Sequence, residues 1–496
     1  MHLKLQSCAV SWVLLAGLAR ADADDAKHKH VAFFSIDGLH ASDVPKWVSA
    51  KPHGAIASLL KTGYWYPGAL TSAPSDSFPG IINLVSGAKP AQSGIWYDDA
   101  YDRSLWNPFS QTGTNCQGAP GAEVVYDETK DYDNTKLWSS PNPTVVGGNI
   151  DPANLPQAMV RGECINLYPH QRLRVNTIFE VVHPHGQTAY TDKHPAYDMV
   201  RGPSGKGLSI GYFPEIQSVD TTNVTQIIGY DTLHVQAFLD WIDGKTPANT
   251  EVQEALTGTP KLFGGNFQAV SVAQKSYGYE PHTLAFTPQL TTALTFVDDS
   301  LGKVVAALQA KSALDDTLIV VCGKHGQTPV DPTLFRRVDQ HLIAPAAGVT
   351  LSQVTSDDVG LLWLADQRDL DKAVAGLEKA RATLAIQDII YGDRLRDMGF
   401  GDPAKDPAVP DIILVPDLGV VYTTSHAKIA EHGGLSADSR NVACFVSNPG
   451  LQKREFDGPV STAQVAPTIL KALGLDPNEL DSVKHGGDDL DVLPGF

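Results

Sequence analysis

Residues 31–38 read VAFFSIDG, an apolar run that ends in the carboxylate of Asp37. The run predicts a strand buried on both faces, because parallel strands covered by helices are almost continuously apolar. Asp37 would then lie at the carboxyl edge of the sheet, where α/β proteins bind ligands. Other apolar runs at 188–191, 267–272, 317–322 and 442–447 alternate with helical patterns at 173–182, 287–311 and 461–473. The sequence therefore predicts an α/β fold with a mostly parallel central sheet flanked by helices.

Residues 73–83 read APSDSFPGIIN and place a hydroxyl at the start of a predicted helix. Pro79 favours the first helical turn, so Ser77 would face unpaired backbone N–H groups and the positive end of the helix dipole. An anionic phosphate suits that position. Serine is also a common capping residue without chemistry. The carboxylate of Asp37 upstream and the imidazoles of His325 and His432 downstream favour a chemical role for Ser77.

Four segments, in this order, resemble the type I phosphodiesterase/nucleotide pyrophosphatase family of the alkaline phosphatase superfamily. The family pattern is an Asp ending the first strand, a Thr or Ser nucleophile before Phe-Pro-Asn, an Asp-His-Gly segment and a final His-Gly. The matching residues here are Asp37, Ser77, Lys324-His325-Gly326 and His432-Gly433. The resemblance covers roughly residues 31–475. It implies an alkaline-phosphatase-like core that hydrolyses phosphoric esters through a phosphoseryl intermediate at Ser77.

The resemblance also implies a divalent metal cofactor, with zinc as the expected ion. Its ligands would be Asp37, Ser77, His325 and His432. Two departures reduce the expectation to one site or partial occupancy: Lys324 replaces the aspartate of Asp-His-Gly, and residues 267–275 lack the family's Asp-x-x-x-His segment. An ammonium cannot ligate a cation. We therefore expect Lys324 to be a catalytic residue that supplies part of the metals' positive charge.

Three polar residues, Asp192, Lys193 and His194, follow the apolar run at 188–191. Lys193 is a candidate for binding substrate, and His194 is a candidate general acid or, together with Asp192, a substitute metal ligand. An equally good interpretation is a solvated ion pair between Asp192 and Lys193, with His194 capping a turn. Gly80 replaces the Asn that holds a phosphoryl oxygen in the family. Asn83, one turn later, is the candidate substitute.

The chain of 496 residues has a formal net charge of -18. This charge opposes binding to nucleic-acid polymers and anionic membranes, so we expect a small phosphorylated substrate as partner. An apolar run at 8–18 followed by Ala19-Arg20-Ala21 is typical of a secretory signal peptide, here residues 1–21. The run is too short to span a bilayer, and residues 488–496 lack the apolar tail of a lipid-anchor signal. We expect a secreted, extracellular protein.

The remaining cysteines fall into two kinds of sequence. Cys116 and Cys164 lie in loop-like segments and could pair in an oxidising compartment. Cys322 and Cys444 lie in apolar runs and are expected to be buried thiols. One glycosylation sequon is present at residues 223–225, Asn-Val-Thr, which agrees with secretion.

The chain's organisation predicts a core with one insertion. Residues 30–331 and 423–496 are assigned to the alkaline-phosphatase-like core. Residues 332–422 are expected to form a small α+β cap with a βαβ-like order. The Pro/Asn/Gly-rich segment 107–156 is expected to be a loop at the rim of the active site.

Two other functions compete with ester hydrolysis. A sulfatase requires Cys/Ser-x-Pro-x-Arg, but Ile81 stands where the Arg belongs, so this alternative ranks low. A catalytically degenerate relative that binds a phosphorylated ligand or partner without turnover is favoured by Lys324 and Gly80. This second alternative stays open.

Overall fold

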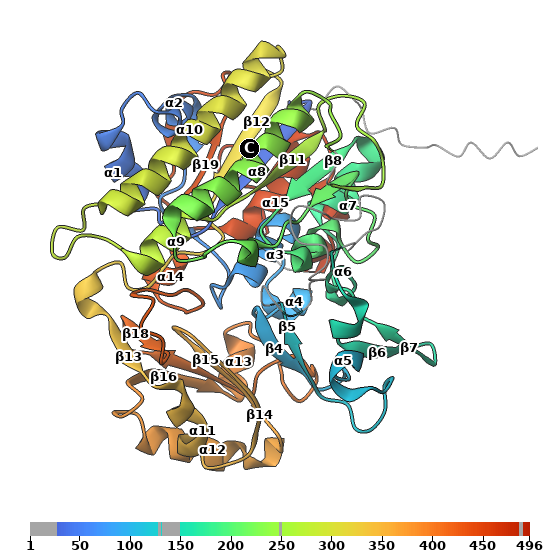
Figure 1. The fold of residues 1–496 in the computed structure, drawn as a ribbon, viewed down its shortest axis with the longest axis vertical. Helices are drawn as coiled ribbons and strands as arrows, with labels where there is room; N and C mark the ends of the chain where they lie inside the picture. Colours follow the sequence, from blue (N-terminus) through green and yellow to red (C-terminus); the bar gives the residue numbers. More distant parts are fainter. Residues whose placement is uncertain (1–26, 127–129, 131–148, 248–249, 486–489) are drawn as a thin grey trace, which may run out of the picture.

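The computed structural model describes residues 27–126, 130, 149–247, 250–485 and 490–496, so the predicted signal peptide lies outside the described residues. Its centre is a nine-stranded sheet in the order β10-β9-β8-β11-β1-β12-β19-β2-β20 (Figure 1). Strands β9, β8, β11, β1 and β12 are mutually parallel, whereas β10 and β19 run antiparallel to their neighbours. The predicted α/β fold with a mostly parallel sheet is confirmed.

The strands of this sheet have the bounds β1 (His30–Ile36), β2 (Gly63–Trp65), β8 (Thr188–Thr191), β9 (Ile210–Tyr212), β10 (Glu251–Val252), β11 (Leu262–Phe267), β12 (Thr317–Cys322), β19 (Cys444–Ser447) and β20 (Arg454–Glu455). One face carries α1 (Asp43–Ala50), α2 (Ala55–Leu59), α8 (Val224–Ile242), α9 (Ala269–Ser276) and α10 (Pro288–Ala310). The other face carries α3 (Ser77–Ser86), α7 (Ile178–Val182) and α15 (Val465–Ala472).

Side chains of β1 alternate between these two helical layers. Val31 and Phe33 pack with residues of α3, α7 and α15. Ala32, Phe34 and Ile36 pack with residues of α1, α2, α8, α9 and α10. All five side chains are fully buried. The continuous apolar run thus follows from helices on both faces of the sheet, and it ends where the strand reaches the open edge.

The strand expected at 267–272 was misplaced. The strand is β11, which ends at Phe267, and most of the predicted segment belongs to helix α9. The two glycines inside β11 argued against a strand in the sequence, because glycine weakens a strand and is favoured there only where another backbone comes close. A Cβ on Gly264 would collide with the carbonyl oxygen of Phe33, and one on Gly265 would press on that of Thr191.

Helix and strand ends differ from the predictions elsewhere as well. The segment 173–182 is helical only from Ile178, because the side chain of Thr177 accepts a hydrogen bond from Glu180 N and caps α7 there. The segment 442–447 becomes a strand at Cys444. The apolar runs at 188–191 and 317–322 match β8 and β12.

Residues 351–416 form a separate four-stranded sheet, seen at the bottom of Figure 1, with the order β14-β15-β17-β16. Its elements are β14 (Leu351–Ser356), β15 (Gly360–Leu364), α12 (Leu370–Lys379), β16 (Ile386–Tyr391) and β17 (Ile412–Pro416), preceded by α11 (Ile343–Ala347). The content is α+β, and the expected succession of strand, helix and strand is present as β15, α12 and β17, but the strands pair antiparallel and so do not form a parallel βαβ unit. The predicted bounds of core and cap remain predictions.

The segment predicted as a loop at 107–156 contains short regular elements where it is described. These are α5 (Phe109–Thr112) and β5 (Ala122–Val125), the latter paired with β4 (Asp99–Asp102). Cys116 forms a disulfide with Cys164 in β7 (Glu163–Asn166), with a Cα–Cα distance of 5.8 Å, whereas Cys322 and Cys444 are buried thiols. Among the described residues, no helix combines the length and apolar character needed to cross a membrane.

Candidate active site

The carboxyl edge of the sheet brings the principal predicted site residues together. Asp37 directly follows β1, and Lys324 and His325 follow the neighbouring strand β12. Lys193 comes shortly after β8, two strands away on the other side of β1. Ser77 is the first residue of α3. The order of strands in the sheet therefore explains why residues far apart in sequence meet.

Ser77 and His325 form a hydrogen-bonded pair. The Oγ atom of Ser77 lies 3.1 Å from Nε2 of His325. The other ring nitrogen, Nδ1, lies 2.9 Å from the carbonyl oxygen of Gly326. A carbonyl can only accept, so Nδ1 carries a proton; when the ring is neutral, Nε2 has the lone pair that accepts from the serine hydroxyl. A hydroxyl within hydrogen-bond distance of an imidazole is the contact that a nucleophile and a general base require.

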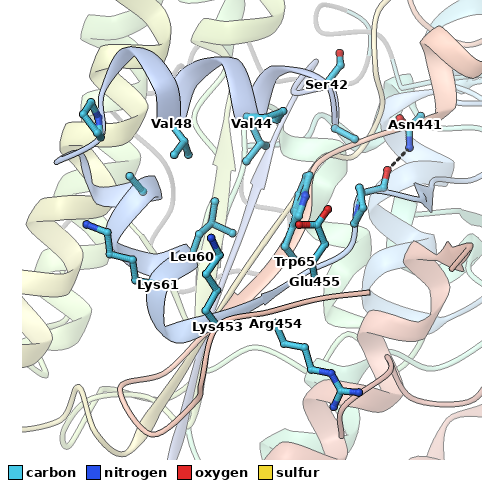
Figure 2. Close-up of a pocket in the computed structure, with 15 residues that line it drawn as sticks. Ser42, Val44, Val48, Leu60, Lys61, Trp65, Asn441, Lys453, Arg454 and Glu455 are labelled. Atoms are coloured by element: carbon cyan, nitrogen blue, oxygen red, sulfur yellow. Dashed lines mark hydrogen bonds between the residues drawn. The ribbon is translucent and has the colours of Figure 1, made fainter. Parts of the chain in front are cut away.

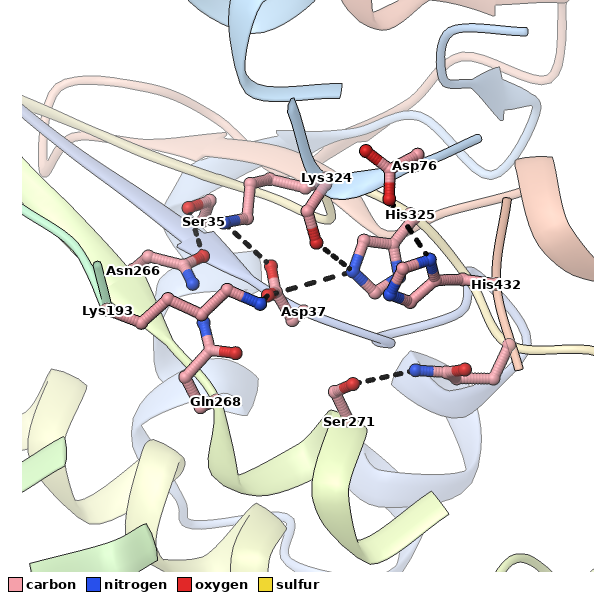
Figure 3. A network of polar contacts seen from close by, with 12 residues as sticks. Ser35, Asp37, Asp76, Lys193, Asn266, Gln268, Ser271, Lys324, His325 and His432 are labelled. Atoms are coloured by element: carbon pink, nitrogen blue, oxygen red, sulfur yellow. Dashed lines mark hydrogen bonds and ion pairs between the residues drawn. The ribbon is translucent and has the colours of Figure 1, made fainter. Parts of the chain in front are cut away.

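Two ammonium groups and an imidazole are directed at Asp37 (Figure 3). Nζ of Lys324 lies 3.3 Å from Oδ1, and Nζ of Lys193 lies 3.8 Å from Oδ2. Nε2 of His325 lies 3.7 Å from Oδ2. Burial opposes ionisation of Asp37, but Lys324, His325 and Lys193 outweigh it and hold the pKa of this carboxyl well below its usual range.

Sequence reasoning missed two residues that enclose Lys324. With its side-chain amide oriented to satisfy its neighbours, Asn266 donates to Asp37 Oδ1 at 3.1 Å and accepts from Lys324 Nζ at 3.1 Å. The ring of Tyr197 covers the ammonium at 4.4 Å from its centroid. Asp192 lies on another side, with both carboxylate oxygens 3.4 Å from Nζ. Asn266 was hidden by the misplaced strand, and Tyr197 has no local sequence signal.

His432 lies beside the Ser77–His325 pair without completing a ligand set. Its ring centroid is 3.9 Å from that of His325, and its Nδ1 lies 3.5 Å from Oδ1 of Asp76. Burial, together with the nearby His325, lowers the pKa of His432 well below its usual range, so the ring is neutral. Asp76 is occupied as the cap of α3, accepting from Phe78 N at 3.0 Å.

Two other predicted residues point elsewhere. His194 is fully buried, and its Nδ1 lies 2.7 Å from Glu215 Oε2. Asn83 donates to the carbonyl oxygen of Ala88 at 3.1 Å and accepts from Thr462 Oγ1 at 2.6 Å. Neither residue lines the cavity beside Ser77. Their predicted roles as general acid and phosphate ligand gain no support from these contacts.

The structure shows why position 80 is a glycine rather than the asparagine of the family pattern. A Cβ at this position would collide with the backbone carbonyl oxygen of Lys324. That oxygen is itself held by the hydroxyl of Thr71, which donates to it at 2.6 Å. An asparagine therefore does not fit at position 80 in this arrangement of α3 and the segment after β12.

A polar cavity of about 550 Å³ opens beside Ser77. Its lining includes Lys193, Lys275, Lys428, Glu431 and His432, together with the aromatic residues Phe78, Tyr97, Tyr126 and Tyr197. Nζ of Lys275 lies 2.8 Å from Glu431, and Lys428 pairs with the same carboxylate. Burial opposes ionisation of Glu431, but the two lysines outweigh it and lower its pKa to about 2. The lining therefore combines lysines and aromatic residues with the carboxylates of Asp98, Asp99, Glu123, Asp357 and Glu431.

Another pocket, of about 570 Å³, lies between α1, α2, β2 and β20 (Figure 2). Apolar residues such as Val44, Val48, Leu60 and Trp65 form much of its wall. It contains none of the predicted site residues. The cavity beside Ser77 is therefore the candidate active site.

A mostly parallel sheet that holds a serine at a helix start beside a carboxylate and an imidazole agrees with the alkaline phosphatase superfamily. The chain belongs to the type I phosphodiesterase/nucleotide pyrophosphatase family, whose sequence model matches residues 31–436. No curated protein sequence gave a significant match.

Solved structures of two relatives share the fold. Murine ectonucleotide pyrophosphatase/phosphodiesterase 5 matches with 13% identity and a TM-score of 0.58, covering 90% of this chain and 96% of that chain. An inactive variant of the mouse protein in complex with AMP matches with 14% identity, the same TM-score of 0.58 and the same coverage of 90% and 96%. The human protein matches with 14% identity and a TM-score of 0.56, covering 90% of this chain and 95% of that chain.

The family uses divalent metal ions, but the donors present here do not fit them. Of the four expected ligands, Asp37 already faces Lys324 and Lys193, and the nearest partner of His432 Nδ1 is Asp76. A divalent ion about 4 Å from an ammonium is repelled by roughly 8 kcal/mol at an effective dielectric constant near 20. The other carboxylates nearby are also engaged: Asp192 faces Lys324, and Asp76 caps α3 and lies against His432.

Proposed function

We propose that this protein is a secreted hydrolase of phosphoric esters and anhydrides in which Ser77 is the nucleophile. The observation that carries the proposal is the Ser77–His325 pair, with 3.1 Å between Oγ and Nε2. The proton on the opposite ring nitrogen is held by the carbonyl oxygen of Gly326. This hydrogen bond leaves Nε2 free to take the serine proton.

In the first step, Ser77 Oγ attacks phosphorus as its proton passes to His325. The new Oγ–P bond replaces the bond to the leaving oxygen, which departs with the electron pair. The imidazolium lies 3.7 Å from the Asp37 carboxylate, which stabilises its positive charge. His325 then gives its proton to the leaving group or to solvent. In the second step it deprotonates a water molecule that cleaves the phosphoserine, and the hydroxyl of Ser77 is restored.

The lining of the cavity supports a small nucleotide-like ligand. Lys193 lies at the inner end beside Asp37, where it can bind a phosphoryl oxygen. Tyr97 and Tyr126 line the cavity and are the aromatic candidates for contact with a base, whereas the Tyr197 ring is already packed against Phe78 and Lys324. AMP, which was bound to the inactive mouse relative, is the first ligand to test.

The test is hydrolysis of chromogenic phosphodiesters and phosphomonoesters by the mature chain and by Ser77→Ala. We expect the variant to lose turnover by at least about 1,000-fold. Ser75→Ala is the matched control, because Ser75 Oγ donates to the carbonyl oxygen of Ser439 rather than to His325. Equal activity of Ser77→Ala and the parent on every ester that the parent cleaves would refute the assignment.

A second candidate is a binding protein without turnover. It is favoured by the fit of Gly80 against Lys324, which removes the asparagine that the family uses to hold a phosphoryl oxygen. In this case AMP would bind to the parent and to Ser77→Ala with similar affinity. No ester would be cleaved by either protein.

A further inference from the structure

The ammonium of Lys324 lies between the buried carboxylates of Asp37 and Asp192, where the family pattern implies a metal ion. We propose that Lys324 is a built-in cation that makes the binding of the anionic ligand independent of divalent metal. The inference deepens the proposed function and rests on it only in assuming that a phosphate group binds beside Ser77.

The surroundings of Lys324 are those of a bound cation. Its Nζ lies 3.3 Å from Asp37 Oδ1, 3.1 Å from Asn266 Oδ1 and 3.4 Å from both carboxylate oxygens of Asp192. Carboxylate and amide oxygens are also the ligands that hard divalent cations prefer. The face of Tyr197 closes the remaining side at 4.4 Å. The ammonium of Lys324 therefore already contacts the oxygen atoms that would have to ligate an ion.

The ammonium cannot easily make way for an ion, because the Lys324 side chain has no exposed surface. Moving it would leave a buried positive charge without its carboxylate partners, which is strongly unfavourable. Its backbone is also fixed, since its carbonyl oxygen accepts from Thr71 and packs against Gly80.

The remaining oxygen of Asp37 faces the ammonium of Lys193 and the imidazole of His325. Oδ2 lies 3.8 Å from Nζ of Lys193 and 3.7 Å from the His325 ring. Lys193 lines the cavity and its side chain is 11% exposed. The two lysines thus differ in position: Lys324 offsets part of the charge of Asp37 and Asp192 from a fully buried site, whereas Lys193, which also faces Asp37, is the one that a phosphate in the cavity can reach. Without Lys324, the charge of Asp37 and Asp192 would repel an anion.

The first experiment measures metal and ligand in the mature parent protein. The protein is purified without chelator, and its zinc, manganese, calcium and magnesium contents are measured by mass spectrometry. The dissociation constant for AMP is then measured by calorimetry before and after treatment with a chelating resin. We expect substoichiometric metal and an unchanged dissociation constant. Stoichiometric zinc, or binding that is lost on chelation and restored by zinc, would overturn the proposal.

The second experiment changes the lysine. Lys324→Met keeps an unbranched side chain without charge and should weaken AMP binding by roughly 10- to 100-fold. Lys324→Asp should bind zinc in a titration that the parent does not show. Lys61→Met is the control, because Lys61 lies in the separate pocket between α1 and β20. Circular dichroism and thermal unfolding show whether each variant is folded.

These readouts separate the inference from the proposed function. If AMP binds to no form of the protein, the nucleotide ligand is wrong, while the metal content of the parent still decides whether Lys324 replaces an ion. If AMP binds without metal but no ester is cleaved, the inference stands and the hydrolase proposal fails. An unchanged affinity in a folded Lys324→Met variant would overturn the role of the lysine.

Discussion

Replacing Gly80 by alanine should destabilise the protein, although alanine is the better helix former. Gly80 lies inside α3, and an added Cβ would meet the backbone carbonyl oxygen of Lys324. A backbone atom cannot rotate away, and Thr71 holds this one through a hydrogen bond of 2.6 Å. Overpacking of this kind costs about 3 kcal/mol, against a gain of about 1 kcal/mol in helix propensity. The expected net loss is about 2 kcal/mol.

Gly229→Ala is the matched control for this substitution. Gly229 also lies inside a helix, α8, but a Cβ there would meet no atom within 4 Å. The control should gain about 1 kcal/mol from helix propensity alone. Urea unfolding of the two variants and the parent should therefore separate the variants by about 3 kcal/mol. If Gly80→Ala were as stabilising as Gly229→Ala, the close contact between α3 and the segment after β12 would be wrong.

Three further predictions concern the base, a buried carboxyl group and the N-terminus. His325→Gln should reduce ester hydrolysis by about 100- to 10,000-fold, because it removes the general base; a folded variant with parental rates would exclude this role. Burial raises the pKa of Asp358 to about 7, above its value near 3.9 in the unfolded chain, so this group lowers stability as pH rises from about 4 to about 7. Asp358→Asn should therefore gain stability over the parent at pH 8 but little at pH 4 in urea unfolding, and an equal gain at both would contradict the shift. N-terminal sequencing of secreted material should find Asp22 first; a mature chain retaining residues 8–18 in a membrane fraction would refute cleavage.

The core strands were predictable where burial on both faces produces a continuous apolar run in the sequence. The runs at 188–191 and 317–322 coincide with β8 and β12, because helices cover both faces and every position is apolar or small. The sequence of strand β11 contains no such apolar run. Its Gly264 and Gly265 are required by neighbouring backbones, and this requirement appears only when β1 and β8 are placed beside it.

The candidate site was predictable in its positions and less so in its contacts. Asp37, Lys193 and Lys324 each follow a parallel strand, and all such strands open at one edge of the sheet. The direction of a side chain is a different matter. The chain turns into a 3-10 helix directly after His194, and the imidazole of His194 contacts Glu215 instead of the cavity.

Two of the departures from the family pattern, Gly80 and Lys324, are best understood as parts of one arrangement. The helix that carries Ser77 lies so close to the segment after β12 that position 80 admits no side chain. The Lys324 side chain leaves this segment with no exposed surface and reaches Asp37. This packing is what the proposed role of Lys324 rests on, because Asp37 and Asp192 already face ammonium groups supplied by the chain itself. The same packing keeps His325 within hydrogen-bond distance of Ser77, so the proposed nucleophile and its proposed base are already in contact.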